Sequence, residues 1–176
     1  MKKIKLYIAA SIDGYIARED GDLDWLMKYP VDSETNYGYD DFFASIDTII
    51  MGGRTYRDIL GMGPVWPYKD KTTFVITRNP VKAEEDIHFI HERIMDKIGQ
   101  LREKEGKDIW LVGGGEIIAM LQDHGMIDEI TITYIPVTLG KGIRLFPASS
   151  GAWEWNLDNK TSYNNGVTQV IYRLKK

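Results

Sequence analysis

The sequence predicts an α/β protein, a three-layer sandwich in which a mixed, mainly parallel eight-stranded sheet lies between layers of helices. Strand-like and helix-like segments alternate through the middle of the chain, which requires crossovers between parallel strands and helices on both faces of the sheet. The chain then ends on two strand-like segments joined by a short turn, which adds an antiparallel hairpin at one edge. Since 176 residues allow one sizeable core, we expect a single domain over residues 1–176.

Runs rich in β-branched and aromatic residues predict the strands. Residues 3–10 alternate and then turn apolar, and residues 73–77 read Thr-Phe-Val-Ile-Thr. The run Asn164-Asn165-Gly166 tolerates positive φ and predicts the turn of the C-terminal hairpin. The eight predicted strands are 3–10, 48–51, 73–77, 87–90, 108–112, 129–136, 153–162 and 167–174.

Four segments carry apolar residues at the helical period. In residues 93–103, for example, Ile94, Ile98 and Leu101 fall on one face at a spacing of three to four residues. The four predicted helices are 39–46, 54–60, 93–103 and 115–123. Each follows or precedes a predicted strand, as a crossover helix does.

Composition excludes several classes of site. A net charge of -4 at pH 7 disfavours a general nucleic-acid binder, which needs a basic face. The absence of cysteine excludes disulfides, thiolate metal sites and a catalytic thiol. The three histidines, His88, His91 and His124, have no metal-ligand spacing, so no metal is expected, and the first two read as polar residues at strand ends. No run approaches the roughly 20 apolar residues of a membrane span, and no signal core follows Met1, so a cytoplasmic location is expected.

A triplet of glycines lies between the predicted strand 108–112 and the helix that follows. The run reads Gly113-Gly114-Gly115-Glu116-Ile117. Residues without side chains let a phosphate approach, and the unpaired N–H groups and positive end of a helix attract it. A tight turn alone needs one glycine, so the triplet favours a pyrophosphate site. The spacing is not the Rossmann fingerprint, because Ile118 occupies its third glycine position.

A second strand-glycine-helix junction is Gly52-Gly53-Arg54-Thr55, which again combines residues without side chains with the N–H groups of a helix start. It adds a guanidinium group that can hold phosphate oxygens in a bidentate fork. After the next strand, Thr77-Arg78 supplies a hydroxyl and another guanidinium, which suit the 2'-phosphate of an adenosine. The carboxyl ends of parallel strands meet at one edge of a sheet. The three junctions together therefore predict a dinucleotide site, for NADPH rather than NADH.

Two N-terminal segments carry candidates for contact with a reacting ring. Ala9 and Ala10 end the first strand, where small side chains let a flat ring lie against the backbone, and the chain then bends at Asp13-Gly14. The alternative is an ordinary Asp-Gly turn over packed alanines. The run Gly-Asp-Leu-Asp-Trp-Leu at 21–26 predicts a short helix with a carboxylate cap, and a carboxylate beside an aromatic pocket can also relay a proton.

Taken together, these motifs resemble the dihydrofolate-reductase-like superfamily over nearly the whole chain. The motifs are Ala-Ala-Ser-Ile-Asp-Gly-Tyr-Ile-Ala (9–17), Gly-Asp-Leu-Asp-Trp-Leu (21–26), Met-Gly-Gly-Arg-Thr-Tyr (51–56), Val-Ile-Thr-Arg (75–78), Val-Gly-Gly-Gly (112–115) and Leu-Gly-Lys-Gly-Ile-Arg-Leu-Phe-Pro (139–147). Within the superfamily, Pro136, the pair Gly140 and Gly142, and Leu145-Phe146 look more like the reductase domain of riboflavin biosynthesis than like folate reductases.

The resemblance implies NADPH bound across the carboxyl ends of the strands. It implies phosphate contacts at 52–55 and 113–117, and 2'-phosphate contacts at Arg54, Thr77 and Arg78. The nicotinamide is expected near Ala9, Ala10, Asp13 and Ile16. Also implied are a homodimer and hydride transfer to a C=N or C=O bond of a small pyrimidine- or pterin-like substrate, in the manner of a 5-amino-6-(5-phosphoribosylamino)uracil reductase.

Departures from the family leave alternatives open. Gly53 stands where the family has a basic residue, with Arg54 one place later. Only Lys69 and Lys71 stand where folate reductases carry an arginine for the glutamate tail, and lysine lacks the bidentate fork, so we do not expect true dihydrofolate reduction. A nucleotide-binding or sensing module without turnover is a further alternative.

The proton donor is the remaining open assignment. Asp24 is the candidate by resemblance, and Asp13 lies closest to the expected nicotinamide. Glu34, Asp40 and Asp41 compete for the role.

Overall fold

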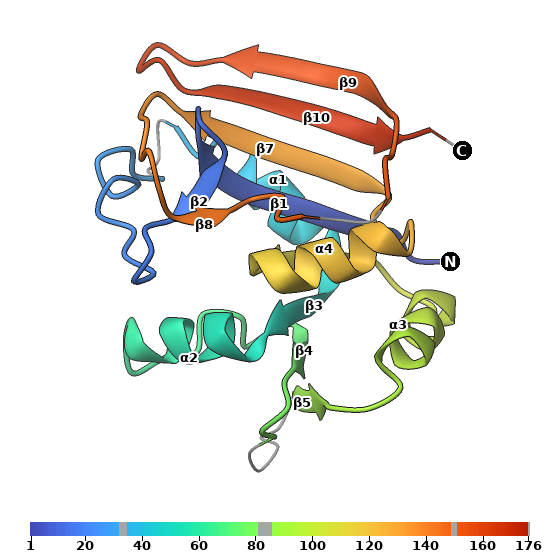
Figure 1. The fold of residues 1–176 in the computed structure, drawn as a ribbon. Coiled ribbons are helices and arrows are strands. Elements are labelled where there is room, and N and C mark those ends of the chain that lie inside the picture. The colour runs from blue at the N-terminus through green and yellow to red at the C-terminus, as the bar shows by residue number, and fades with distance from the viewer. Residues whose placement is uncertain (32–34, 81–85, 149–150, 176) are drawn as a thin grey trace.

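The computed structural model describes residues 1–31, 35–80, 86–148 and 151–175, so Glu34 lies outside the described residues. Its main sheet contains β1 (Ile4–Ser11), β3 (Ile46–Gly52), β4 (Thr72–Ile76), β5 (Ile87–Ile90), β6 (Asp108–Gly113), β7 (Glu129–Ile135), β9 (Trp155–Ser162) and β10 (Thr168–Leu174). The strand order is β5-β4-β3-β6-β1-β7-β10-β9 (Figure 1). Neighbouring strands are parallel except where β10 pairs with β7 and β9. The predicted mixed, mainly parallel sheet of eight strands is confirmed.

Two helices cover each face of this sheet. Helices α1 (Tyr39–Ala44) and α2 (Gly53–Gly61) pack on one face, and α3 (Ile94–Glu103) and α4 (Gly115–Asp123) pack on the other. The alternation along β6 shows the two sides, because Ile109 and Leu111 join the core under α3 and α4, whereas Trp110 joins the core under α1 and α2. The predicted three-layer sandwich is confirmed.

The structure corrects the prediction at three places. The helix expected over 39–46 ends at Ala44, and Ile46, which is fully buried, instead begins β3. The short helix expected at 21–26 is a series of turns, in which Asp22 Oδ1 accepts a hydrogen bond from the amide of Asp24 at 3.0 Å. Two short strands, β2 (Tyr15–Ala17) and β8 (Ile143–Arg144), pair in a separate sheet that the sequence did not predict.

The turns at 21–29 are held against the sheet by one buried aromatic side chain. Trp25 is 3% exposed and packs with Tyr37, with Ile135 at the end of β7 and with Val167 before β10. This contact anchors the segment that follows β2 beside the carboxyl end of β1. Across the described ranges, no helix is both long and apolar enough to cross a membrane.

Candidate functional site

A cleft of about 1270 Å³ opens at the carboxyl ends of β1, β3, β4 and β6, the edge at which open α/β sheets bind ligands. Its walls come from residues 21–27, from the first turns of α2 and α4, and from the residues that follow β4 and β5. A pocket for one drug-sized molecule usually holds about 300–1,000 Å³. The cleft is therefore larger than a pocket for one such molecule.

The two predicted glycine turns adjoin in this cleft. A Cβ atom added to Gly52 would lie 3.8 Å from the carbonyl oxygen of Gly113 and 3.8 Å from the amide nitrogen of Gly114. Helices α2 and α4 begin at these turns with extended N-cap residues, Gly52 and Gly114, and neither N-cap makes a side-chain hydrogen bond. A Cβ at Gly114 would also lie 3.5 Å from the Thr55 hydroxyl. Two uncapped helix starts therefore present backbone N–H groups and positive dipole ends to one place, which is an arrangement suited to an anion.

Most of the predicted cofactor-binding residues line the cleft, and two do not. Those that line it are Ala9, Ile16, Gly52, Gly53, Arg54, Thr55, Thr77, Arg78, Gly114, Gly115, Glu116 and Ile117. Ala10 instead lies in the core, where it is fully buried. Gly113 is buried behind the turn with φ at 124°, a conformation that favours glycine, so its contribution is to turn the chain.

Positively charged side chains gather at the end of the cleft beside the first turn of α2. Arg54 Nη2 donates to the carbonyl oxygen of Asp20 at 3.0 Å, so this side chain crosses from α2 to the segment after β2. Arg57 turns back toward the start of the same helix, with Nη1 3.5 Å from the position of a Cβ on Gly53. Arg78 and His91 line the cleft where β4 and β5 end.

Sequence reasoning missed Arg57 and His91, although both left a signal. Arg57 follows Arg54 by three residues on a predicted helix, which puts both on one face. His91 directly follows a predicted parallel strand, as Thr77 and Arg78 do. The expectation that His91 is only a strand-end polar residue overlooked that such ends meet at the ligand-binding edge.

Asp13 does not line the cleft. Its carboxylate connects the turn after β1 to the loop after β7 by hydrogen bonds. Its carboxylate accepts the amide of Leu139 at 3.1 Å, the amide of Gly140 at 2.7 Å and the hydroxyl of Ser11 at 2.6 Å. Desolvation acts to raise the pKa of Asp13, but the hydrogen bonds from Ser11, Gly140 and Leu139 outweigh it and the pKa is lowered. An ionised carboxylate committed to three donors is poorly suited to give up a proton.

Asp24 lines the cleft and is held in an ion pair. Arg18 Nε lies 2.6 Å from Asp24 Oδ1, and Arg18 Nη2 lies 3.1 Å from Oδ2, with half of the Asp24 side chain exposed. The hydrogen bond from Arg18 lowers the pKa of Asp24, so this carboxyl group is ionised near neutral pH. The geometry therefore disfavours Asp24 as a donor of its own proton.

One part of the cleft lining is apolar; we call it the distal end. It is lined by Leu26 and Met27 on one wall and by Ile59, Met62 and Tyr68 on the other. Burial raises the pKa of Tyr68, so its hydroxyl stays protonated and can donate a hydrogen bond at neutral pH.

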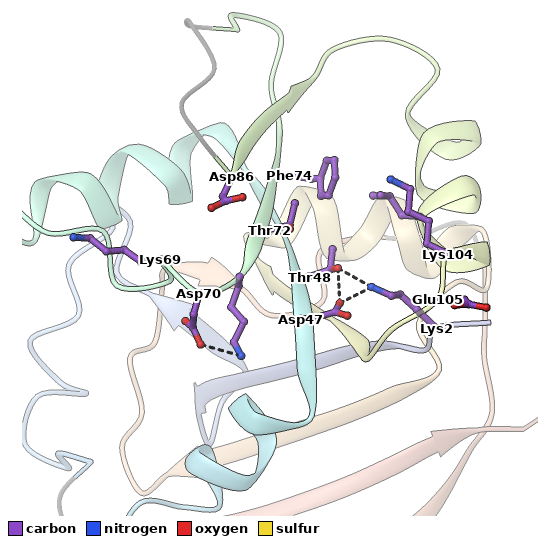
Figure 2. Close-up of a pocket in the computed structure, with 12 residues that line it drawn as sticks. Lys2, Asp47, Thr48, Lys69, Asp70, Thr72, Phe74, Asp86, Lys104 and Glu105 are labelled. Atoms are coloured by element: carbon purple, nitrogen blue, oxygen red, sulfur yellow. Dashed lines mark hydrogen bonds and ion pairs between the residues drawn. The ribbon is translucent and has the colours of Figure 1, made fainter.

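A smaller cavity of about 420 Å³ lies at the opposite edge of the sheet, around the amino ends of β3 and β4 (Figure 2). We call it the basal cavity. Its buried lysines are paired: Lys2 Nζ donates to Asp47 Oδ1 and to the Thr48 hydroxyl, and Lys71 Nζ lies 3.2 Å from Asp70. These charges neutralise one another, so the basal cavity is interpreted as a structural ion-pair cluster.

The ion pair of the basal cavity should make stability depend on acidity. Desolvation acts to raise the pKa of Asp47, but hydrogen bonds from Lys2, Thr48 and the Lys107 amide outweigh it and the pKa is lowered. Stability from Asp47 is therefore present above its unfolded pKa of about 3.9 and is lost as pH falls through the folded value. We expect Asp47→Asn to lower the free energy of unfolding at neutral pH by about 1–2 kcal/mol, because Lys2 loses its charged partner.

Urea unfolding at pH 7 and at about pH 3 measures this effect, and the difference between wild type and Asp47→Asn should shrink at the lower pH. Asp41→Asn, on the exposed side of α1, is the control, with an expected change within about 0.5 kcal/mol. A difference between wild type and Asp47→Asn that stays constant with pH would contradict the assignment.

No group of three or more His, Asp or Glu side chains in the described ranges could hold a metal ion.

Comparison with known proteins shows the family to which this chain belongs. The RibD C-terminal domain family matches residues 60–169, more than half of the chain. The protein YwjB of Bacillus subtilis is 42% identical over 167 residues, which cover 94% of this chain and 95% of YwjB. A structure from Shewanella sp. PV-4, assigned to riboflavin biosynthesis, is 29% identical with a TM-score of 0.89 and covers 99% of both chains.

Dihydrofolate reductase from Enterococcus faecalis, complexed with NADP(H) and RAB-propyl, shares the fold. It is 19% identical with a TM-score of 0.66, over 99% of this chain and 97% of that one. The predicted resemblance is confirmed, and the chain belongs to the RibD C-terminal domain family, whose reductase-like domains have the dihydrofolate-reductase-like fold.

Proposed function

We propose that this protein is an NADPH-dependent oxidoreductase, acting as a single domain over residues 1–176, that reduces a C=N or C=O bond of a small pyrimidine- or pterin-like molecule. The observation that carries the proposal is the adjoining pair of uncapped helix starts at Gly52 and Gly114, with arginine side chains beside it. Backbone N–H groups from two helices favour a doubly phosphorylated carrier over a single phosphate. Family membership supports the reductase class.

The residues of the cleft fit a dinucleotide with a 2'-phosphate. The first turns of α2 and α4, at 53–55 and 115–117, would hold the pyrophosphate, because both helix starts line the cleft and present backbone N–H groups to it. Thr77, Arg57, Arg78 and His91 would hold the adenosine end, where the two guanidinium groups suit an extra phosphate. Ala9 and Ile16 would contact the nicotinamide.

When bound, the cofactor supplies the hydride. The chain supplies position and the route for a proton. Asp24 is ionised and half exposed at the cleft, so we propose that it orders a water molecule that passes a proton from bulk solvent to the acceptor atom, the water being reprotonated by solvent in the same transfer. Asp13 acts from outside the cleft, as a positioning residue that holds the turn at Leu139 and Gly140.

The test is a fluorescence titration of wild type, Arg57→Ala and Arg78→Ala with NADPH and with NADH. We expect wild type to prefer NADPH, and each variant to bind NADPH about tenfold more weakly with little change for NADH, because an exposed charge-assisted contact is lost. Arg173→Ala, on β10 and paired with Asp158 of the edge strand β9, is the matched control and should bind like wild type. Equal affinity of wild type for the two cofactors would remove the 2'-phosphate assignment.

One observation favours a second candidate, a nucleotide-binding or sensing module without turnover. Both predicted proton donors, Asp13 and Asp24, have lowered pKa values. Loss of NADPH absorbance with any member of a carbonyl and imine substrate panel would support the reductase, and binding without oxidation across the panel would support the sensor. A homodimer in the cytoplasm remains part of the proposal.

A further inference from the structure

The distal end of the cleft offers a ligand apolar surface from both walls. Helix α2 begins at the phosphate-binding turn, and Ile59 and Met62 lie six and nine residues beyond Gly53, or about 9–14 Å at the helical rise of about 1.5 Å per residue. On the other wall, Leu26 packs in the same apolar cluster as Ala9, which places it beside the carboxyl end of β1. The distal end therefore lies beyond the phosphates, where a substrate would sit next to the reacting ring.

Two methionines at the distal end are unusually open to water. Met27 is 75% exposed and Met62 is 68% exposed, although both line the cleft. Methionine is flexible and polarizable, and it adapts its surface to apolar and aromatic partners. Exposed methionines on both walls favour a flat, apolar molecule that removes them from water.

Carboxylates adjoin the residues of the distal end along the chain: Asp58 stands beside Ile59, and Asp24 stands two residues before Leu26. Asp22, Asp24 and Asp58 line the cleft. Asp24 engages Arg18, and Asp58 Oδ2 lies 3.9 Å from Arg54 Nε, so two guanidinium groups already have carboxylate partners. To gain an ion pair here, a phosphate or carboxylate tail would have to displace one of these carboxylates from its guanidinium group. It would then lie beside the displaced carboxylate, and like charges brought together disfavour binding.

Among the described residues that line the cleft, the arginines lie where the phosphates of the proposed cofactor would bind. Arg57 and Arg78 lie with the first turn of α2 and the end of β4. Lys69 and Lys71, the residues nearest in sequence to the tail-binding arginine of folate reductases, line the basal cavity at the other edge of the sheet (Figure 2). Neither lysine lines the cleft, so the cleft wall offers carboxylates where a tail would extend.

We propose that the substrate of this reductase is a flat heterocycle without a phosphate or carboxylate tail. The inference rests on the proposed function and narrows it, because the riboflavin-type substrate suggested by resemblance carries a phosphate. The exposed apolar walls and the carboxylates of the distal end are the features that select such a molecule.

Three matched pairs of probes test this inference: 5-amino-6-(ribosylamino)uracil, neopterin and riboflavin, each with and without a terminal phosphate. Each is titrated by calorimetry into protein saturated with NADP⁺. We expect at least one unphosphorylated member to bind and its phosphate ester to bind at least about tenfold more weakly, because of the carboxylates. A phosphate ester that binds as well as its partner, or the failure of all three unphosphorylated members to bind, would overturn the proposal.

Met27→Arg and Met27→Gln form the variant pair. A guanidinium on this exposed wall should reduce the discrimination against phosphate by about tenfold, whereas the neutral amide should leave it unchanged. A separate NADPH titration of each protein distinguishes the two proposals. If NADPH fails to bind, the proposed function fails; if NADPH binds and the phosphate esters are accepted, only the substrate class fails.

Discussion

Replacing Asp128 with alanine is expected to lower the free energy of unfolding by about 3–5 kcal/mol, because it leaves a buried guanidinium without its counter-charge. Arg102 Nη2 lies 3.0 Å and 2.8 Å from the two carboxylate oxygens of Asp128, and both side chains are only 12% exposed. Asp128 Oδ2 also accepts the amide of Ile4 at 2.9 Å, so one carboxylate joins the end of α3 to the start of β1. For a protein of this size the melting temperature should fall by roughly 6–20 °C.

Thermal and urea unfolding at neutral pH measure the effect, and a double variant separates its causes. Arg102→Leu with Asp128→Leu removes both charges, and it should be more stable than Asp128→Ala because no uncompensated charge remains buried. A loss below about 1 kcal/mol in Asp128→Ala would show that the ion pair does not hold α3 to the sheet.

The longer elements could be predicted from the sequence because their apolar residues repeat at a regular spacing over many positions. Helix α4 was predicted with its observed bounds, 115–123, and the helix predicted over 93–103 is α3, Ile94–Glu103. In both, burial repeats at the spacing that the apolar residues show. In such segments the spacing of apolar residues indicates the secondary structure, whatever other elements pack against them.

The sheet of β2 and β8 could not be predicted, because it contains three and two residues and depends on contacts distant in sequence. Its strands come together where Asp13 accepts the amides of Leu139 and Gly140. Gly142 is needed for a close approach, since a Cβ there would lie 2.3 Å from the carbonyl oxygen of Ala17, and its φ of 154° also favours glycine. Neither contact leaves a periodic pattern in the chain.

The same distinction applies to the site. The two glycine turns could be predicted to meet, because they follow parallel strands that share a sheet edge. The state of Asp24 could not be predicted, because it depends on whether Arg18, six residues earlier in an irregular segment, turns toward it. Backbone placement follows from topology, whereas the ionisation of a side chain follows from partners that topology does not specify.

The position of the first turn of α2 gives the sharpest test of the phosphate site. We expect Gly53→Ala to weaken NADPH binding by about 10–100-fold. A Cβ on Gly53 would lie 2.7 Å from Thr77 Oγ1 and 2.9 Å from Thr77 Cβ, so either the helix start or the end of β4 must move. Overpacking of this kind costs about 1–3 kcal/mol, and both elements carry proposed phosphate contacts.

Gly61→Ala is the matched control in the same helix. A Cβ there meets nothing within 4 Å, so the same change of residue should leave NADPH affinity intact and raise stability by up to about 1 kcal/mol. Titration with NADPH, together with the melting temperature of each variant, separates lost binding from lost folding. If Gly53→Ala remains folded and binds NADPH as Gly61→Ala does, then the first turn of α2 does not hold the phosphates, and the glycine turns serve only to pack two helices against neighbouring strands.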